Sequence, residues 1–516
     1  MKRALLIGWL LSGAASAQFG RSGAEWVTNG ADSQRSHSIP TDPRISPEKM
    51  QEPGFEFLWK RKLPNDPVQL NSLTPAILMD RYIGYRGFRS FAFVAGSSNR
   101  IWAIDSDLDR LEWEAKLPAK ASAGSPNCPG GLTSSIARST MAEYPVPSTF
   151  GGLGGRGKPA QSDVGESGEG ATTIAAAVRA PVNPNPGSAR PASSPVRRPP
   201  ERRRPAVIYA LSSDGSLHAL YISNGEEAYP PIPFIPADAN AEGLVVIDDV
   251  AYTSTHNCNG AHAGVWALDL TSKEVASWKP ASGDIAGTAG PAFGPDGTIY
   301  VATTAGDLVA LEPKTLSVQA TYSTGGQAFT SSPVVFRYRK DDLVGASTRD
   351  GSIHVVSTSS MSSPFLKTAP FSTDFRPGAL STCQMAGGIR WLFAASDKAI
   401  RAWRIVDRKG TPVIEQAWTR EMTSPLTPMI VNGVVFALAS GEYRTDDPTV
   451  AATERAHKSS PAVLYALDGA TGRTLWDSGK TITSFVHGGG LSGGARQIYL
   501  GTYDGTFYAF GFPIEH

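Results

Sequence analysis

The chain has 516 residues, and its 48 Lys and Arg against 47 Asp and Glu give a formal net charge of +1. A nearly neutral chain has no global field that would steer it to nucleic acid or to an anionic membrane surface, and we expect neither as a partner. The 53 glycines and 39 prolines are typical of a β-rich protein with many turns.

The chain begins with the pattern of a cleavable signal peptide over residues 1–17. Lys2 and Arg3 precede a short apolar stretch at 4–11, and Ala-Ser-Ala at 15–17 is a typical cleavage site. The apolar stretch is shorter than the ~20 residues that a membrane span needs. No cysteine at the cleavage site offers a lipid anchor. We therefore expect a soluble periplasmic or secreted protein without a membrane span, with a net charge of −1 after cleavage.

A four-residue pattern with a small third residue then returns eight times. Seven of the eight third positions are alanine, and the eighth is Val355. The pattern occupies residues 101–104, 217–220, 265–268, 308–311, 353–356, 400–403, 464–467 and 507–510. Five of the seven intervals are 43–48 residues, which is the spacing of four-stranded propeller blades. We attribute the small residue to close packing between neighbouring blades.

Two insertions explain the two longer intervals. Residues 142–205 are rich in Gly, Pro, Ser and Arg and have no hydrophobic period, which predicts a disordered surface loop. Its arginine run at 197–204 fits a solvated linker, with contact to an anionic polymer or a partner protein as the alternative. Residues 442–460 are polar and predict a second long loop.

Each repeat also carries turn and strand signals around the pattern. Asp-Gly or a related pair precedes it in most units and supplies the positive φ of a tight hairpin turn. In the best-formed units an acidic residue, a turn and a tryptophan follow, namely Trp113, Trp278 and Trp476. We interpret these tryptophans as structural packing between blades, rather than as a stacking surface for a ligand.

The two ends of the repeat region complement one another. The eighth unit has no room for an outer strand. Residues 55–63, with Trp59, are predicted to form an outer strand but precede the first repeat unit. Pairing the two would close a ring and remove an exposed sheet edge. The prediction is an all-β, eight-bladed β-propeller of four-stranded antiparallel blades over 55–516, preceded by an N-terminal extension at 18–54.

Residues 465–476, Tyr-Ala-Leu-Asp-Gly-Ala-Thr-Gly-Arg-Thr-Leu-Trp, resemble the repeat of the pyrroloquinoline-quinone (PQQ) β-propeller superfamily. The resemblance covers about residue 54 to the C-terminus, apart from the insertions. Trp26, Gly30, Asp32 and Arg35 also resemble the N-terminal stretch of PQQ-dependent alcohol dehydrogenases, with shorter spacing after Asp32.

That superfamily includes dehydrogenases with PQQ and calcium in the central channel, and non-catalytic members that use the ring as a scaffold. This chain has no adjacent cysteine pair to cover a quinone and no Cys-x-x-Cys-His haem site. The family's calcium ligands and catalytic aspartate have no matching motif in this chain. We therefore expect a monomeric, non-catalytic binding module without a cofactor, whose partner is a protein, polymer or small molecule. The alternative is an alcohol or sugar dehydrogenase with PQQ and calcium.

Three cysteines allow three disulfide pairings. Cys128 and Cys258 fall in neighbouring units, so we favour their pairing and expect Cys383 to remain buried and free. His256, Cys258 and His262 form a cluster whose spacing matches no familiar zinc site, so we favour a disulfide loop there.

His487, followed by three glycines, is expected on an innermost strand near the channel, where the glycine backbone could approach a ligand closely. Glycine is also required for steric reasons at the crowded centre of a propeller. The glycines therefore do not assign a role to His487.

Overall fold

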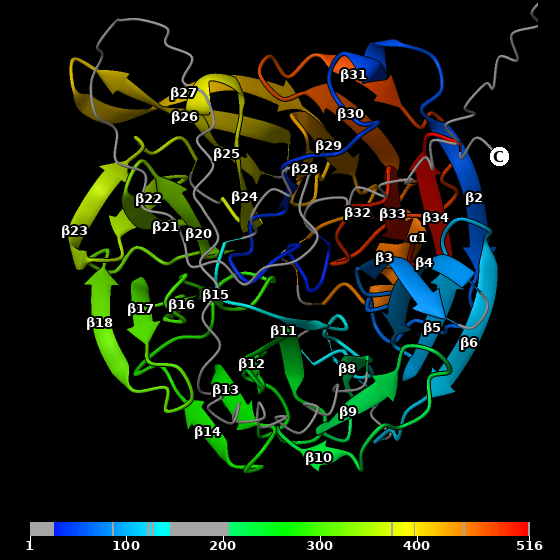
Figure 1. Cartoon of the computed structure of the whole chain (residues 1–516). Coiled ribbons are helices and arrows are strands. Elements are labelled where there is room, and N and C mark those ends of the chain that lie inside the picture. The colour runs from blue at the N-terminus through cyan, green and yellow to red at the C-terminus, as the bar shows by residue number, and fades with distance from the viewer. Residues whose placement is uncertain are drawn as a thin grey trace, which may run out of the picture. The chain divides into compact units, whose positions relative to one another are not determined.

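The computed structural model describes residues 25–84, 87–120, 124–125, 128–144, 206–372, 375–396, 398–445, 447 and 449–513. The predicted signal peptide and most of the first insertion lie outside these residues. The described strands form eight sheets, arranged as the blades of a ring around a central channel (Figure 1). The predicted eight-bladed propeller is therefore confirmed.

The blades follow one another in chain order, and within each blade the strands are named from the channel outward. Blade 1 contains β3 (Ile77–Gly84), β4 (Gly87–Gly96), β5 (Arg100–Asp105) and β6 (Arg110–Lys116). Blade 2 contains β8 (Val207–Leu211), β9 (Ser216–Tyr221) and β10 (Ile232–Pro233). Blade 3 contains β7 (Ser139–Thr140), β11 (Asn240–Ile247), β12 (Val250–His256), β13 (Gly264–Asp269) and β14 (Val275–Trp278). Blade 4 contains β15 (Ala292–Phe293), β16 (Ile299–Ala302), β17 (Asp307–Leu311) and β18 (Val318–Ser323).

The second half of the ring repeats this arrangement. Blade 5 contains β20 (Val334–Tyr338), β21 (Asp341–Ser347), β22 (Ile353–Ser357) and β23 (Ser360–Lys367). Blade 6 contains β19 (Ser331–Ser332), β24 (Gly378–Gln384), β25 (Arg390–Ala395), β26 (Ala399–Arg408) and β27 (Thr411–Glu421). Blade 7 contains β1 (Ser38–Ile39), β28 (Met429–Val431), β29 (Val434–Ala439), β30 (Val463–Asp468) and β31 (Thr474–Asp477). Blade 8 contains β32 (Ser492–Gly494), β33 (Gln497–Gly501), β34 (Thr506–Gly511) and β2 (Glu56–Lys62).

The helical segments are η1 (Lys49–Gln51), η2 (Ala386–Gly388) and α1 (Ala452–Lys458). Among the described residues, no helix has the length and apolar character needed to cross a membrane. Blade 2 departs from the predicted four strands, because its innermost position is a single bridge between Ala137 and Tyr209.

Ring closure follows the prediction from the two chain ends. Strand β2 pairs antiparallel with β34, and Trp59 lies opposite Ala509. The indole N–H of Trp59 donates to the Ser106 carbonyl of blade 1 at 3.1 Å. The first strand of the repeat region therefore completes the last blade and ties it to the first.

The repeated alanine has a more specific partner than the sequence indicates. In four blades it lies directly opposite a tryptophan of the outer strand. The pairs are Ala103 with Trp113, Ala402 with Trp418, Ala466 with Trp476 and Ala509 with Trp59. Cross-strand neighbours lie about 5 Å apart, so a methyl group on one strand leaves room for an indole on the other.

The N-terminal segment, residues 26–39, lies across the channel (blue, at the centre of Figure 1). Its hydrogen bonds reach seven blades in chain order. Its carbonyl oxygens accept hydrogen bonds from backbone N–H groups of six blades, and Thr28 donates to the Leu244 carbonyl of blade 3 at 2.6 Å. The six pairs are Trp26 with Leu78, Val27 with Arg138, Ser33 with Phe293, Gln34 with Val335, Ser36 with Thr382 and His37 with Ile430.

A buried arginine holds this segment in the channel. Arg35 is fully buried, and its guanidinium donates to the carbonyls of Pro291 at 2.9 Å and Gly243 at 2.6 Å. It also donates to the Asn29 carbonyl at 2.6 Å and the Thr28 hydroxyl at 2.8 Å. Burial lowers its pKa to about 9, partly offset by the nearby Asp32. The guanidinium thus satisfies backbone oxygens of blades 3 and 4 as well as its own segment.

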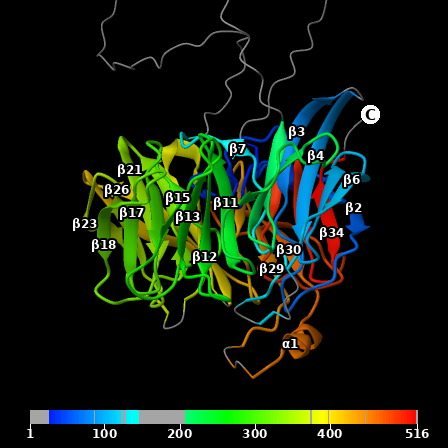
Figure 2. The same cartoon turned by 90° about the horizontal axis from the view of Figure 1, so that it is seen from below.

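The second insertion contains a short helix, where the sequence predicts a loop. α1 has strong helix formers, and Lys458 forms an ion pair with Glu454 one turn earlier at 2.7 Å. The base of the insertion is closed by a hydrogen bond from the Ser460 N–H to the Gly441 carbonyl. Figure 2 shows α1 standing off one face of the ring.

Candidate functional site

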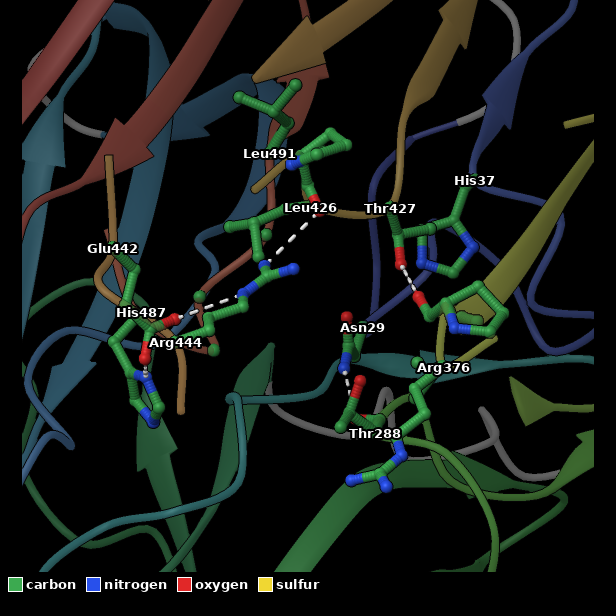
Figure 3. Close-up of a pocket in the computed structure, with 18 of the residues that line it drawn as sticks. Asn29, His37, Thr288, Arg376, Leu426, Thr427, Glu442, Arg444, His487 and Leu491 are labelled. Carbon is green, nitrogen blue, oxygen red and sulfur yellow. Dashed lines mark hydrogen bonds and ion pairs between the residues drawn. The ribbon is translucent and has the colours of Figure 1, made fainter. Parts of the chain in front are cut away.

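A cavity of about 450 Å³ lies at the mouth of the channel, on the face that carries α1. A second cavity of about 310 Å³ shares six lining residues with it, so the two form one concave surface, called the channel cavity below. The shared residues are Asn29, Thr288, Arg455, His487, Gly488 and Gly489. Figure 3 shows side chains of the larger cavity, contributed by blades 4, 6, 7 and 8 and by the N-terminal segment.

The N-terminal segment forms part of the cavity wall. The Asn29 amide donates to the Thr288 carbonyl at 3.2 Å and fixes this part of the segment to blade 4 (Figure 3). His37 is buried, and burial lowers its pKa to about 4, so its imidazole is neutral at pH 7. His37 therefore contributes a polar but uncharged surface.

Glu442 is the buried carboxylate of the channel cavity, with 4 % of its side chain exposed. It accepts hydrogen bonds from His487 Nδ1 at 2.8 Å and Arg455 Nη2 at 2.7 Å, and Arg444 Nε lies 3.5 Å away. Burial by itself would raise the pKa of Glu442, but the His487 hydrogen bond and the two guanidinium charges lower it. The carboxylate is thus ionised at neutral pH, and its Oε1 accepts both of these hydrogen bonds.

The insertion and a glycine-rich loop bring this cluster together. Glu442, Arg444 and Arg455 all come from the insertion at 442–460, whereas His487 precedes β32 of blade 8. The neighbouring Gly488 has φ +60°, a conformation that L side chains rarely adopt. The glycine therefore lets the chain turn directly after the histidine.

The charge of the channel cavity is positive where the cluster lies. Among the described residues that line the larger cavity, Arg376, Arg444 and Arg455 are basic and Glu442 is acidic. Since Arg is always protonated near neutral pH, these described lining residues carry more positive than negative charge. A surplus of this sign in a concave site favours an anionic ligand.

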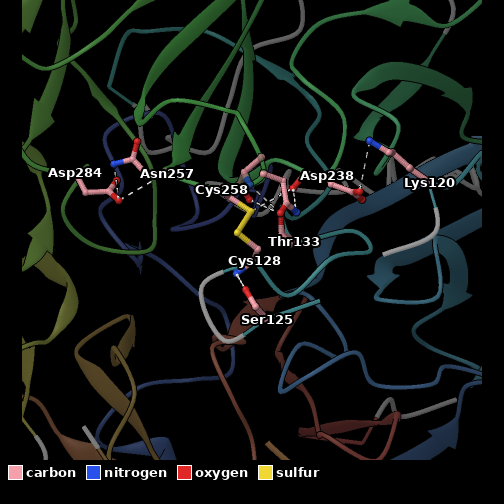
Figure 4. Close-up of a disulfide and its surroundings, with 10 residues drawn as sticks. Lys120, Ser125, Cys128, Thr133, Asp238, Asn257, Cys258 and Asp284 are labelled. Atoms are coloured by element: carbon pink, nitrogen blue, oxygen red, sulfur yellow. Dashed lines mark hydrogen bonds and ion pairs between the residues drawn. A yellow bond between two sulfur atoms is a disulfide. The ribbon is translucent and has the colours of Figure 1, made fainter. Parts of the chain in front are cut away.

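Two of the three cysteines form a disulfide, shown in Figure 4. A disulfide joins Cys128 to Cys258, with Cα atoms 5.4 Å apart, and links the loop before blade 2 to the end of β12 in blade 3. Cys383, on β24 of blade 6, is a buried free thiol, and burial raises its pKa to about 12.

The His256, Cys258 and His262 side chains do not converge on one point. His256 lies between Glu242, at 3.3 Å, and Asp284, at 3.1 Å. Burial opposes its protonation, but the two carboxylates prevail and raise its pKa to about 10. The His262 ring stacks on Trp266, with centroids 4.8 Å apart. Each of these groups is therefore engaged in packing, ion pairing or the disulfide.

The tryptophans singled out in the sequence lie at blade contacts. The Trp113 indole donates to the Ile222 carbonyl of blade 2 at 2.8 Å, and Trp476 meets Phe55 edge to face with centroids 4.9 Å apart. Trp278 packs against the apolar core between blades 3 and 4. Trp418, which the sequence pattern did not single out, donates in the same way to the Gly469 carbonyl of blade 7 at 3.0 Å.

The carboxylates described in the channel cavity do not fit a calcium site. Ca²⁺ takes six to eight oxygen ligands, usually with several carboxylates. The buried Glu442 is occupied by a histidine and two guanidiniums, and Glu242 is paired with His256. Within the described ranges, no group of three or more His, Cys, Asp or Glu side chains is placed to hold a metal ion.

Sequence reasoning placed His487 near the channel but missed its partners. Glu442, Arg444 and Arg455 lie in a segment without a repeat pattern, and no local spacing indicates that they meet. Their only signal is the alternation of opposite charges within an otherwise polar insertion.

No protein-family profile matches the chain, and no curated protein sequence matches it. Solved structures with the same fold are similar to it at low identity. Quinohemoprotein alcohol dehydrogenase from Comamonas testosteroni aligns with a TM-score of 0.56 and 12 % identity, covering 96 % of this chain and 82 % of its own. A europium-containing methanol dehydrogenase aligns with a TM-score of 0.53 and 10 % identity, covering 95 % and 98 %. The computationally designed Ika8 protein aligns with a TM-score of 0.51 and 12 % identity, covering 89 % and 100 %. The resemblance seen in the sequence is thus confirmed at the level of the fold, because the chain shares the propeller fold of these dehydrogenases.

Proposed function

We propose that the protein is an exported, non-catalytic propeller that binds an anionic ligand in its channel cavity. The observation that carries this proposal is the pairing of Glu442. A general base must be free to accept a proton, and a calcium ligand must be free to coordinate. Glu442 is poorly placed for either role, because its Oε1 accepts hydrogen bonds from His487 and Arg455 and Arg444 lies beside its Oε2.

The same cluster is well suited to binding. Its guanidiniums are held in place by Glu442, so a ligand would meet donors that are already oriented. Arg recognises carboxylates and phosphates through parallel N–H donors, and the volume of the channel cavity is that of a small-molecule site.

Differential scanning fluorimetry with citrate, succinate and inorganic phosphate tests this proposal. We expect at least one of these anions to raise the melting temperature of the wild-type protein in a saturable way. The shift should be lost in Arg444→Gln and Arg455→Gln and retained in Arg408→Gln, whose side chain is exposed and lies outside the channel cavity. Equal shifts in all four proteins would contradict a site at this cluster.

The competing function, a PQQ-dependent dehydrogenase, requires a separate experiment. Purified protein would be incubated with PQQ and Ca²⁺, desalted, and assayed for bound quinone and for dye-linked oxidation of alcohols and sugars. We expect no turnover. Stoichiometric quinone retention with dye reduction would overturn the non-catalytic proposal.

Export is proposed from the N-terminal sequence. Cleavage after Ala17 would give a mature chain that begins at Gln18. Intact-mass measurement of the extracytoplasmic fraction tests this, and a cytoplasmic chain that retains residues 1–17 would contradict it.

A further inference from the structure

The smaller part of the channel cavity, of about 310 Å³, is lined by charged side chains of both signs. Among the described residues that line it, Glu242 is acidic and Arg455 is basic. Glu242 lies on β11 of blade 3, whereas Arg455 lies on α1 of the second insertion. Within the described chain no ion pair joins these two side chains, since Glu242 pairs with His256 and Arg455 with Glu442. Two opposite charges that do not neutralise one another therefore border this hollow.

Strand alternation places the Glu242 side chain on the cavity side of β11. Asn240 and Glu242 both line the cavity, whereas Ala241 between them is buried in the apolar core. Alternate residues of a strand project from the same face of its sheet. The Glu242 side chain is 20 % exposed, and its Oε1 accepts no hydrogen bond from the described residues. A ligand can therefore reach this carboxylate.

The Glu242 end of the cavity carries an excess of negative charge. The His256 imidazole lies 3.3 Å from Glu242 and 3.1 Å from Asp284, and these carboxylates raise its pKa to about 10, so it is charged at pH 7. Two carboxylates against one imidazolium leave about one negative charge. In the part of the chain that the structure describes, no Lys or Arg pairs with either carboxylate. An unbalanced negative charge at a concave site favours a cationic group.

The Arg455 end carries the opposite excess. Arg455 Nη2 donates to Glu442 at 2.7 Å, and Arg444 Nε lies 3.5 Å from the same carboxylate. Two guanidiniums against one carboxylate leave about one positive charge. A ligand that complements both ends needs an anionic and a cationic group, because a dianion would meet Glu242 as a like charge.

The volume of this part of the cavity limits the size of the ligand. A volume of about 310 Å³ holds on the order of ten waters, which is a space for a small molecule. Leu70, Leu73 and Pro75 also line it, so it offers apolar surface to a short aliphatic side chain.

We infer that this part of the channel cavity binds a small zwitterion, namely an amino acid or a short peptide with both ends free. The carboxylate of the ligand lies by Arg455, and its ammonium lies by Glu242. This inference rests on the proposed function and names the ligand class for the same site, because the carboxylate is the anionic group that the proposed function requires.

Isothermal titration calorimetry with small unlabelled ligands tests the inference. The probes are L-alanine and L-alanyl-L-alanine, and the comparison ligands are N-acetyl-L-alanyl-L-alanine and L-alanyl-L-alanine amide. We expect saturable binding of at least one probe, and the tighter of the two identifies an amino acid or a peptide as the ligand. Capping either end of the dipeptide should weaken binding at least about tenfold, which corresponds to ~1.4 kcal/mol.

Variants assign the two ends of the ligand. Glu242→Gln should weaken the tighter probe at least about tenfold but keep the rise in melting temperature that citrate causes, whereas Arg455→Gln should lose both responses. The matched control is Glu415→Gln, which also removes a carboxylate from an ion pair but lies on β27, outside the cavity, and it should bind normally. Circular dichroism and thermal unfolding establish that each variant is folded.

The outcomes separate this inference from the proposed function. Absence of saturable binding by both probes, or equal affinity for the free and N-acetylated dipeptides, would overturn the inference. A Glu242→Gln protein that loses the citrate response together with the probe would show a structural role for Glu242 and would likewise overturn it. Citrate binding without probe binding defeats the inference alone, whereas PQQ-dependent turnover defeats the proposed function as well.

Discussion

Replacing Arg35 with methionine should destabilise the whole propeller. Arg35 is buried and donates to three carbonyl oxygens and one hydroxyl at 2.6–2.9 Å. Methionine fills much of the same volume but leaves these acceptors without their donor, and each unsatisfied buried acceptor costs roughly 1–3 kcal/mol. It also leaves the buried Asp32 without its nearby positive charge.

Part of this loss is recovered because the buried guanidinium no longer has to be desolvated. Removing one member of a buried charged arrangement costs about 3–5 kcal/mol in comparable cases, and we expect a loss of that size for Arg35→Met. Such a loss is a large fraction of the roughly 5–15 kcal/mol that is typical of a folded domain.

Urea unfolding followed by tryptophan fluorescence measures this loss. Arg35→Lys keeps the charge, but its compact ammonium has three donors in place of five and cannot span acceptors as far apart as the planar guanidinium does. It should therefore lose more than half as much unfolding free energy as Arg35→Met. Arg408→Met, at an exposed ion pair with Glu415, should change the unfolding free energy by less than about 1 kcal/mol. An Arg35→Met protein that unfolds at the wild-type midpoint would refute the argument that this side chain ties the N-terminal segment to the ring.

Three further predictions concern blade contacts. Gly472→Ala should lower the free energy of unfolding by about 1–3 kcal/mol, because φ is +72° at this residue and the added Cβ would lie 2.7 Å from the Trp418 ring. Chemical denaturation of the variant and the wild type measures the difference. The loss of unfolding free energy caused by His256→Gln should become smaller as pH rises. The folded pKa of His256, about 10, lies above the unfolded value, so its stabilisation is complete below about pH 6.5 and is lost toward pH 10. The stability difference between the two proteins should shrink by up to ~1.4 kcal/mol per pH unit across that window, and a constant difference would contradict it. Cys258→Ser should cost about 2–4 kcal/mol in oxidised protein, and peptide mapping without reductant should find the link to Cys128.

The sequence was sufficient for the ring because each blade repeats the same local rules. The alanine pattern, the Asp-Gly turns and the strand with Trp59 each specify a contact between residues close in the chain or at its two ends. Blade number, strand order and closure all follow from these signals. The reason for the alanine was only partly predicted, since its place opposite an outer-strand indole depends on strand register.

The candidate site was predictable only in part, since its members come from segments outside the repeat. His487 was found through its glycines. Glu442 and Arg455 lie 13 residues apart in an insertion with no period, and a short helix sets their contact. The N-terminal segment was also missed, because its carbonyls pair with strands up to 393 residues away and no local pattern reports such contacts.

The course of the N-terminal segment has a consequence for the order of assembly. Residues 26–39 are made early, yet their binding partners extend from Leu78 to Ile430. Contacts between residues so distant in sequence carry a high loop-closure cost and form late. The segment can therefore dock along its full length only when seven correctly spaced blades are present. A ring with a missing or misplaced blade would leave it undocked, with the fully buried Trp26 and Arg35 exposed to water.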